Sequence, residues 1–183
     1  MPEEYSTMSD QTNPTAAELV QLLDKYLFGW AYKDIERASV QGSAKLAGFI
    51  LGACFIDAVA SFYSGVDKDT AKTGSTKRFT DFVRKYMPQY NAEDLWRDLR
   101  CGLVHSYAEG GTYVFTDSNK AGFHLDTTPR GKIILNLEDF CADLRKAYGL
   151  LRKDILTDRD VLLNAKRRFT SMGLMMESPI NQL

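Results

Sequence analysis

The feature that most constrains the fold is a run of apolar and small residues in the first third of the chain. The run extends without a charge from Leu46 to Ile56 and continues, after Asp57, to Tyr63. A helix over about Ser43–Tyr63 would be apolar nearly all round, which is typical of a helix surrounded by other helices. Because Asp57 interrupts the run before it reaches the ~20 residues that a membrane span needs, we favour a central buried helix and expect no membrane association.

Capping patterns at helix N-termini divide much of the remaining sequence into elements. Each pattern places a side-chain acceptor over free backbone N–H groups, with an acidic residue three positions later. The four pairs are Thr15 with Glu18, Asn91 with Asp94, Asn136 with Asp139, and Thr157 with Asp160. These caps predict four helices: one over about 16–39, one over about 92–107, one that begins at 137 and a last one over about 158–169. Apolar spacing predicts a further, shorter helix that stops at Pro88.

Between residues 112 and 135 the apolar period changes from about 3.6 to about 2 residues. The segments Thr112–Thr116, Gly122–Asp126 and Lys132–Leu135 are short, rich in β-branched or aromatic residues, and separated by turn residues. We predict a small antiparallel meander or hairpin that is inserted after the fourth helix.

The fold class expected is therefore mostly α, an antiparallel helical bundle of about five to six helices with this β insertion at about 112–135. One domain over residues 15–172 is expected, between a flexible tail at 1–14 and a loosely held tail at 173–183.

Charge and cysteine usage exclude several classes of protein. A formal net charge of −1 argues against binding of long nucleic acid by counterion release alone, although a local basic patch is compatible with it. Cys54, Cys101 and Cys141 are scattered, without a CxxC pair, and the first residues are polar, so a reducing cytoplasm is the expected location. His124 has no His or Cys near it in sequence, and we expect neither a metal site nor a cofactor.

The chemistry that this chain can offer is concentrated in the fourth predicted helix. Arg100 and His105, one of only two histidines, combine a fixed cation with a proton-transfer group. On an ideal helix, residues five apart point about 140° away from each other. Side chains from two copies of the chain could therefore contact one small ligand group more easily than side chains from one copy. Because Cys101 and Val104 make this side of the helix half apolar, we expect another copy to cover it, which predicts a symmetric homodimer with a composite site.

The segment Arg100–His105, RCGLVH, late in a helix of an all-α bundle, resembles the Arg-x(4 to 6)-His signature of HEPN domains. In that family the motif implies a homodimeric, metal-independent endoribonuclease, in which the 2′-hydroxyl of RNA attacks the adjacent phosphate. By this resemblance His105 moves protons and Arg100 stabilises the charge on the phosphoryl oxygens. Arg97, one turn earlier, would position the RNA backbone.

Two further interpretations remain open at this stage. The family usually has a polar residue after the arginine and this chain has Cys101. This favours, as an alternative, a catalytically inactive HEPN-like interaction or regulatory module that binds RNA, a nucleotide or a partner protein and dimerises through the motif helix. A bundle of unrelated type, in which His105 only satisfies a hydrogen bond, is the third.

Asp57 lies inside the apolar helix, where an unpaired carboxylate would be costly. We expect an ion pair with an arginine such as Arg97 or Arg100. That ion pair would either hold the two helices together or orient the catalytic arginine.

Overall fold

Helix α3 (Lys45–Ser64) forms the centre of the fold, as the apolar run predicts. In the computed structural model, residues 13–41, 44–65, 74–106, 111–117 and 123–172 are described. α3 contacts the first helical segment, α4, η4, α7 and α8. By length and composition alone α3 could also cross a membrane, but a core helix passes the same test, and more than half of α3 is buried by its neighbours.

The described residues form six continuous helical segments. The first runs through α1 (Ala16–Leu23), the π-helical η2 (Asp24–Tyr32), α2 (Lys33–Glu36) and the π-helical η3 (Arg37–Gln41). After α3 and α4 (Ser75–Tyr86), the fourth segment combines α5 (Ala92–Leu95), the π-helical η4 (Trp96–Leu103) and α6 (Val104–Ser106). The last two are α7 (Leu137–Thr157) and α8 (Arg159–Met172).

Three of the four predicted caps are confirmed. Thr15 and Glu18 form a complete capping box at the start of α1. The side chains of Asn91 and Asn136 each accept a hydrogen bond from the backbone N–H three residues later. These short-range contacts fix where α1, α5 and α7 begin.

The fourth predicted cap is wrong. α7 continues through Thr157, whose hydroxyl donates to the carbonyl of Lys153 one turn earlier. Asp158 caps α8 instead, because its carboxylate accepts from the backbone N–H groups of Asp160 and Val161. A neighbouring carboxylate therefore replaces the hydroxyl as the acceptor.

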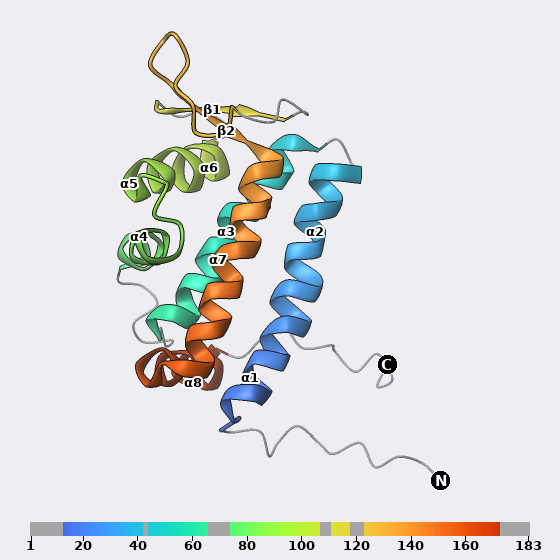
Figure 1. Cartoon of the computed structure of the whole chain (residues 1–183), viewed down its shortest axis with the longest axis vertical. Coiled ribbons are helices and arrows are strands. Elements are labelled where there is room, and N and C mark those ends of the chain that lie inside the picture. Colours follow the sequence, from blue (N-terminus) through green and yellow to red (C-terminus); the bar gives the residue numbers. More distant parts are fainter. Residues whose placement is uncertain (1–12, 42–43, 66–73, 107–110, 118–122, 173–183) are drawn as a thin grey trace.

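The prediction of an antiparallel bundle is also wrong. In Figure 1 the first segment runs opposite to α3 and α7, but α3 and α7 run in the same direction, and α4, the α5–α6 segment and α8 cross them steeply. The contacts agree, since Gly48 of α3 faces Leu137 of α7, and Gly52, one turn on, faces Phe140 and Leu144. The short crossing helices return the chain to the end where α3 starts before α7 begins.

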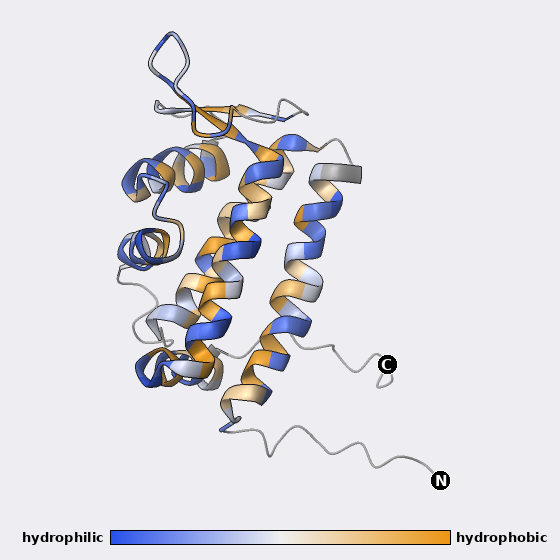
Figure 2. Cartoon of the chain, viewed as in Figure 1, coloured by the Kyte–Doolittle hydropathy of each residue, from blue (hydrophilic) through white to orange (hydrophobic). Residues whose placement is uncertain are grey.

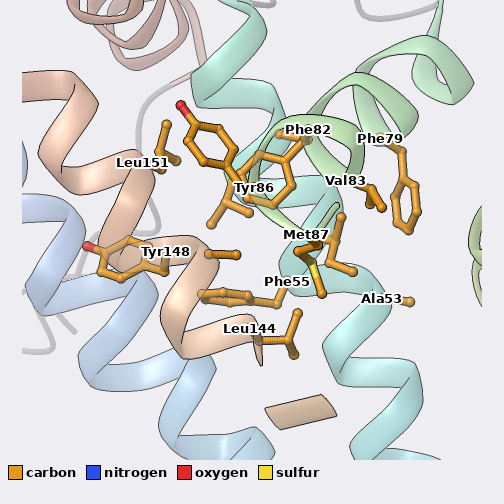
Figure 3. Close-up of a cluster of buried hydrophobic side chains, with 14 of the residues drawn as sticks. Ala53, Phe55, Phe79, Phe82, Val83, Tyr86, Met87, Leu144, Tyr148 and Leu151 are labelled. Atoms are coloured by element: carbon orange, nitrogen blue, oxygen red, sulfur yellow. The ribbon is translucent and has the colours of Figure 1, made fainter. Parts of the chain in front are cut away.

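The core lies between α3, α4 and α7. Figure 3 shows Phe55, Phe82, Met87 and Tyr148 converging from these elements and from the turn after α4, and each is almost fully buried. Figure 2 shows hydrophobic residues where the helices face one another and hydrophilic residues on the outer sides of α4 and α8. One connected cluster includes buried residues from α1 through α8.

The β insertion contains a parallel sheet, not the predicted antiparallel hairpin. β1 (Tyr113–Thr116) pairs in parallel with β2 (Ile133–Asn136), with Tyr113 opposite Ile133. A single antiparallel bridge joins Thr127 to Ile133 on the other side of β2. Alternating hydrophobicity predicts strands but not the order in which they pair. Here β2, the last strand in sequence, lies between β1 and the segment that contains Thr127. Residues 118–122, which include Gly122 of the predicted middle segment, lie outside the described residues.

Replacement of Gly52 by alanine tests the close contact of α3 with α7. A Cβ at this position would lie 2.6 Å from Cε1 of Phe140, a fully buried ring, so the helices must move apart. We expect Gly52→Ala to lower the free energy of unfolding by about 1–3 kcal/mol in urea titrations.

Gly149→Ala is the matched control. Gly149 lies inside α7, and a methyl group added to it would meet nothing within 4 Å beyond the adjoining residues and backbone of its own helix. This change should therefore raise the free energy of unfolding by about 0.5–1 kcal/mol. If both substitutions were stabilising, the close packing of α3 on α7 would be contradicted.

Candidate functional site

The fourth helical segment, from α5 to α6, carries Arg100 and His105 and is called the motif helix below; it buries one side and exposes the other. Leu95, Leu99 and Leu103 are buried completely against the core, and Trp96 is half-buried beside them. Tyr107, which helical spacing places on the same side as these residues, lies outside the described part of the chain. The hydrophobic side therefore holds the helix in place and leaves its outer residues available.

Arg100 and His105 meet within one chain, which corrects the predicted divergence. Nη1 of Arg100 lies 2.7 Å from Nε2 of His105. The reason is the wide turn of η4, in which the N–H of Val104 donates to the carbonyl of Leu99, five residues earlier. In such a turn, residues five apart come to the same side of the helix, and π-helical turns occur frequently at functional sites.

Asp57 and Trp96 hold Arg100 from two further directions. Nε of Arg100 donates to Oδ2 of Asp57, which confirms the predicted ion pair between α3 and the motif helix. The guanidinium also lies over the ring of Trp96, 5.5 Å from the ring centroid, and Phe79 of α4 packs edge-on against the same ring. Arg100 is thus placed by residues from α3, α4 and η4 before any ligand binds.

The contact with Arg100 fixes the protonation of the His105 ring. A guanidinium can only donate hydrogen bonds, so Nε2 of His105 accepts and the ring proton lies on Nδ1. His105 is exposed, and the described residues supply no hydrogen-bond partner for its Nδ1 or for Nη2 of Arg100. These two groups can therefore donate to a bound anion.

Arg97 is engaged by other residues of the chain. It pairs with the buried Asp98 at 2.8 Å and with Asp94 at 2.7 Å, and it donates to the hydroxyl of Thr112. Asp98 also accepts from the backbone N–H of Thr112, so the pair joins η4 to the start of β1. Burial alone would raise the pKa of Asp98, but the bonds from Arg97 and Thr112 outweigh it and lower that pKa. The geometry thus gives Arg97 a contact that holds β1 onto η4.

An apolar stripe of α3 continues from the site. Ala47, Leu51 and Cys54 follow one another at helical spacing and are exposed, and Asp57 lies at the end of the stripe. Partial burial raises the pKa of the Cys54 thiol, although nearby Arg100 lowers it, so the thiol stays protonated at neutral pH. Val104 of the motif helix is half-buried and packs against the core.

Sequence reasoning misses two features of the structure. Helical spacing places Trp96 in the core, yet its ring also supports Arg100. The sequence predicts no role for His124, yet it joins Tyr90 and Asp143 in a hydrogen-bonded cluster. No group of three or more potential metal ligands occurs among the residues that the structure describes.

Comparison with known protein families, with curated proteins and with solved structures finds no match to this chain. These comparisons give no support to an assignment of the chain to the HEPN family.

The link between η4 and β1 predicts a stability that depends on Asp98. Asp98→Ala leaves the N–H of Thr112 without its buried acceptor and should lower the free energy of unfolding by about 2–3 kcal/mol at pH 7. Because the folded-state pKa of Asp98 lies below the unfolded value of about 3.9, this stabilisation is lost as the pH falls through the folded-state pKa. The difference between parent and variant should therefore shrink in strong acid.

Asp94→Ala is the control for this prediction. Its contact with Arg97 lies at the surface and contributes less than about 1 kcal/mol. Equal losses in the two variants, measured by urea titration, would argue against a special role for Asp98.

Proposed function

We propose that this protein is a homodimeric, metal-independent endoribonuclease of HEPN-like type. The observation that carries the proposal is the contact of Arg100 with His105 on an exposed surface, with Asp57 and Trp96 fixing the arginine from behind. A cation and an imidazole at this distance are the two groups that cleavage of RNA by its own 2′-hydroxyl needs. Both come from one chain, and Asp57 and Trp96 hold Arg100 in place before substrate binds.

In this mechanism a backbone phosphate binds Nη1 and Nη2 of Arg100. The phosphate displaces His105 from Nη1, and the freed Nε2 accepts the proton of the 2′-hydroxyl. The 2′-oxygen then bonds to phosphorus as the bond from phosphorus to the 5′-oxygen breaks, while Arg100 stabilises the added negative charge. The products are a 2′,3′-cyclic phosphate and a 5′-hydroxyl.

The leaving 5′-oxygen needs a proton, and a second copy of the chain supplies it. We assign this role to His105 of the partner subunit in its charged form, because histidine exists in both forms near neutral pH. The apolar stripe of Ala47, Leu51 and Cys54 beside the site supplies the surface on which the second copy packs. The dimer thus provides one base and one acid to each scissile bond.

Two substitutions test the chemical roles. His105→Ala should lower the rate of cleavage of single-stranded RNA in EDTA by about 10²- to 10⁴-fold, and Arg100→Ala by about 10²- to 10³-fold. Rates are measured on a labelled single-stranded RNA at saturating protein.

Arg130→Ala is the matched control, because Arg130 is exposed in the turn before β2, away from the motif helix. It should cleave at the parental rate. Cleavage by His105→Ala at the parental rate would end the proposal.

A charge on the apolar stripe tests the dimer. The side chain of Leu51 is 37% exposed in one chain, and Leu150 on α7 is 40% exposed. Leu51→Arg should give a monomer in sedimentation experiments and reduce cleavage, whereas Leu150→Arg should leave the dimer intact. A parent protein that sediments as a monomer at micromolar concentration would contradict the assigned interface.

A second candidate function is the inactive interaction module. The observation in its favour is that Asp57 pairs with Arg100 and cancels much of the charge that a phosphate would seek. In that case the protein binds a partner or an RNA without cleaving it. RNA that binds to the protein in EDTA but stays uncleaved, at the protein concentration of the cleavage assay, would select this alternative.

A further inference from the structure

A second cluster of titratable side chains does not include Arg100 or His105 and has no part in the mechanism above. His124 belongs to the turn that precedes Thr127, Tyr90 to the turn between α4 and α5, and Asp143 to α7. The side chain of His124 is 12% exposed, and Tyr90 is buried. Three segments that are distant in sequence therefore meet at one imidazole.

The direction of each hydrogen bond in this cluster is determined. The backbone N–H of Asn136 donates to Nδ1 of His124 at 3.1 Å, so Nδ1 carries no proton. The hydroxyl of Tyr90 donates to Oδ2 of Asp143 at 2.7 Å, so its oxygen accepts from Nε2 of His124 at 2.8 Å. The ring is neutral in this arrangement, with its proton on Nε2.

Asp143 is the charged end of this chain of hydrogen bonds. Burial would raise the pKa of Asp143, but the neighbouring His124 ring and the hydrogen bonds from Tyr90 and Gln89 outweigh burial and lower it. Burial also raises the pKa of the Tyr90 phenol, with Asp143, Tyr113 of β1 and Asp139 of α7 as the surrounding groups that add to the effect. Tyr90 thus stays protonated and Asp143 stays ionised.

The turn that His124 anchors is strained. Leu125 has φ of +65°, a backbone conformation that residues other than glycine adopt only at a cost in free energy. Leu125 is also tied to β2, because its N–H donates to the carbonyl of Ile134 at 2.8 Å. Strain of this kind persists only where the surroundings impose it, and it gathers at switch regions.

A second proton on the ring is incompatible with the observed contacts. Protonated Nδ1 would face the N–H of Asn136, donor against donor, at a residue that is 5% exposed. The charged ring would be drawn instead to Asp143, whose Oδ2 already lies 3.5 Å from Nε2. The hydrogen bond from the N–H of Asn136 is then lost, and the strained turn loses the contact that holds it in place.

We propose that the turn around His124 is a proton-sensitive latch on the β insertion. Neutral His124 holds the turn between the N–H of Asn136 and the Tyr90–Asp143 pair, and protonation of the ring releases it from Asn136. Histidine ordinarily changes charge between about pH 5 and 8, and this is the range over which the latch is tested. The half-exposed Phe123 belongs to the segment that is released.

The test is NMR of the full chain in a His105→Gln background, which leaves His124 as the only histidine. At pH 8 the ring should carry one proton, on Nε2, and the amide of Asn136 should be protected from exchange. At pH 5 both ring nitrogens should be protonated, and the protection factor of this amide should fall roughly tenfold. An unchanged protection factor, or a ring that stays neutral at pH 5, would overturn the proposal.

Two variants separate the latch from general acid destabilisation. His124→Gln should abolish the pH dependence of protection at Asn136. Leu125→Gly relieves the strain without touching the imidazole, so it should keep the amide protected at a lower pH than the parent. The same acid loss in His124→Gln, or an unchanged midpoint in Leu125→Gly, would contradict the latch.

Discussion

The fold depends on the need to cover α3. A helix whose residues are apolar on nearly every side leaves no face that water can solvate at low cost, so neighbours must pack all around it. Gly48 and Gly52 let α7 approach closely, and the aromatic residues of α4 and α7 fill the other sides. The stripe of Ala47, Leu51 and Cys54 stays exposed, and it leads to the one carboxylate in the middle of the helix.

That carboxylate connects the core to the candidate site. Asp57 is fixed by the burial of α3, and its bond to Arg100 fixes the arginine in turn. Trp96 supports the guanidinium from the motif helix, so that the group has little freedom to lose when it binds an anion. The same bond limits the net charge of the site, because the Asp57 carboxylate offsets the charge of the guanidinium.

The sequence predicts the elements better than their arrangement. Amphipathic spacing and the caps at Thr15, Asn91 and Asn136 act over a few residues, and the elements that they predict are confirmed. The parallel order of β1 and β2 depends on which distant segments pair, and alternation carries no information about that choice. The cap predicted at Thr157 is wrong for a local reason, because Asp158 supplies a better acceptor one residue later.

The residues of the site can be predicted from the sequence, but their geometry cannot. Asp57 needs a cationic partner, and Arg100 is one of the two that the sequence offers on the motif helix. An ideal helix separates Arg100 from His105, whereas the π-helical turn brings them to one side. The cluster at His124 gives no sequence signal, because Tyr90 and Asp143 are far from it along the chain.

The central claim is that Arg100 and His105 form a site that cleaves RNA through its own 2′-hydroxyl. The most direct measurement is the identity of the new RNA ends after incubation with the purified parent protein in EDTA. We expect 2′,3′-cyclic phosphate and 5′-hydroxyl ends. New 5′-phosphate ends, or RNA that stays intact, would contradict the claim.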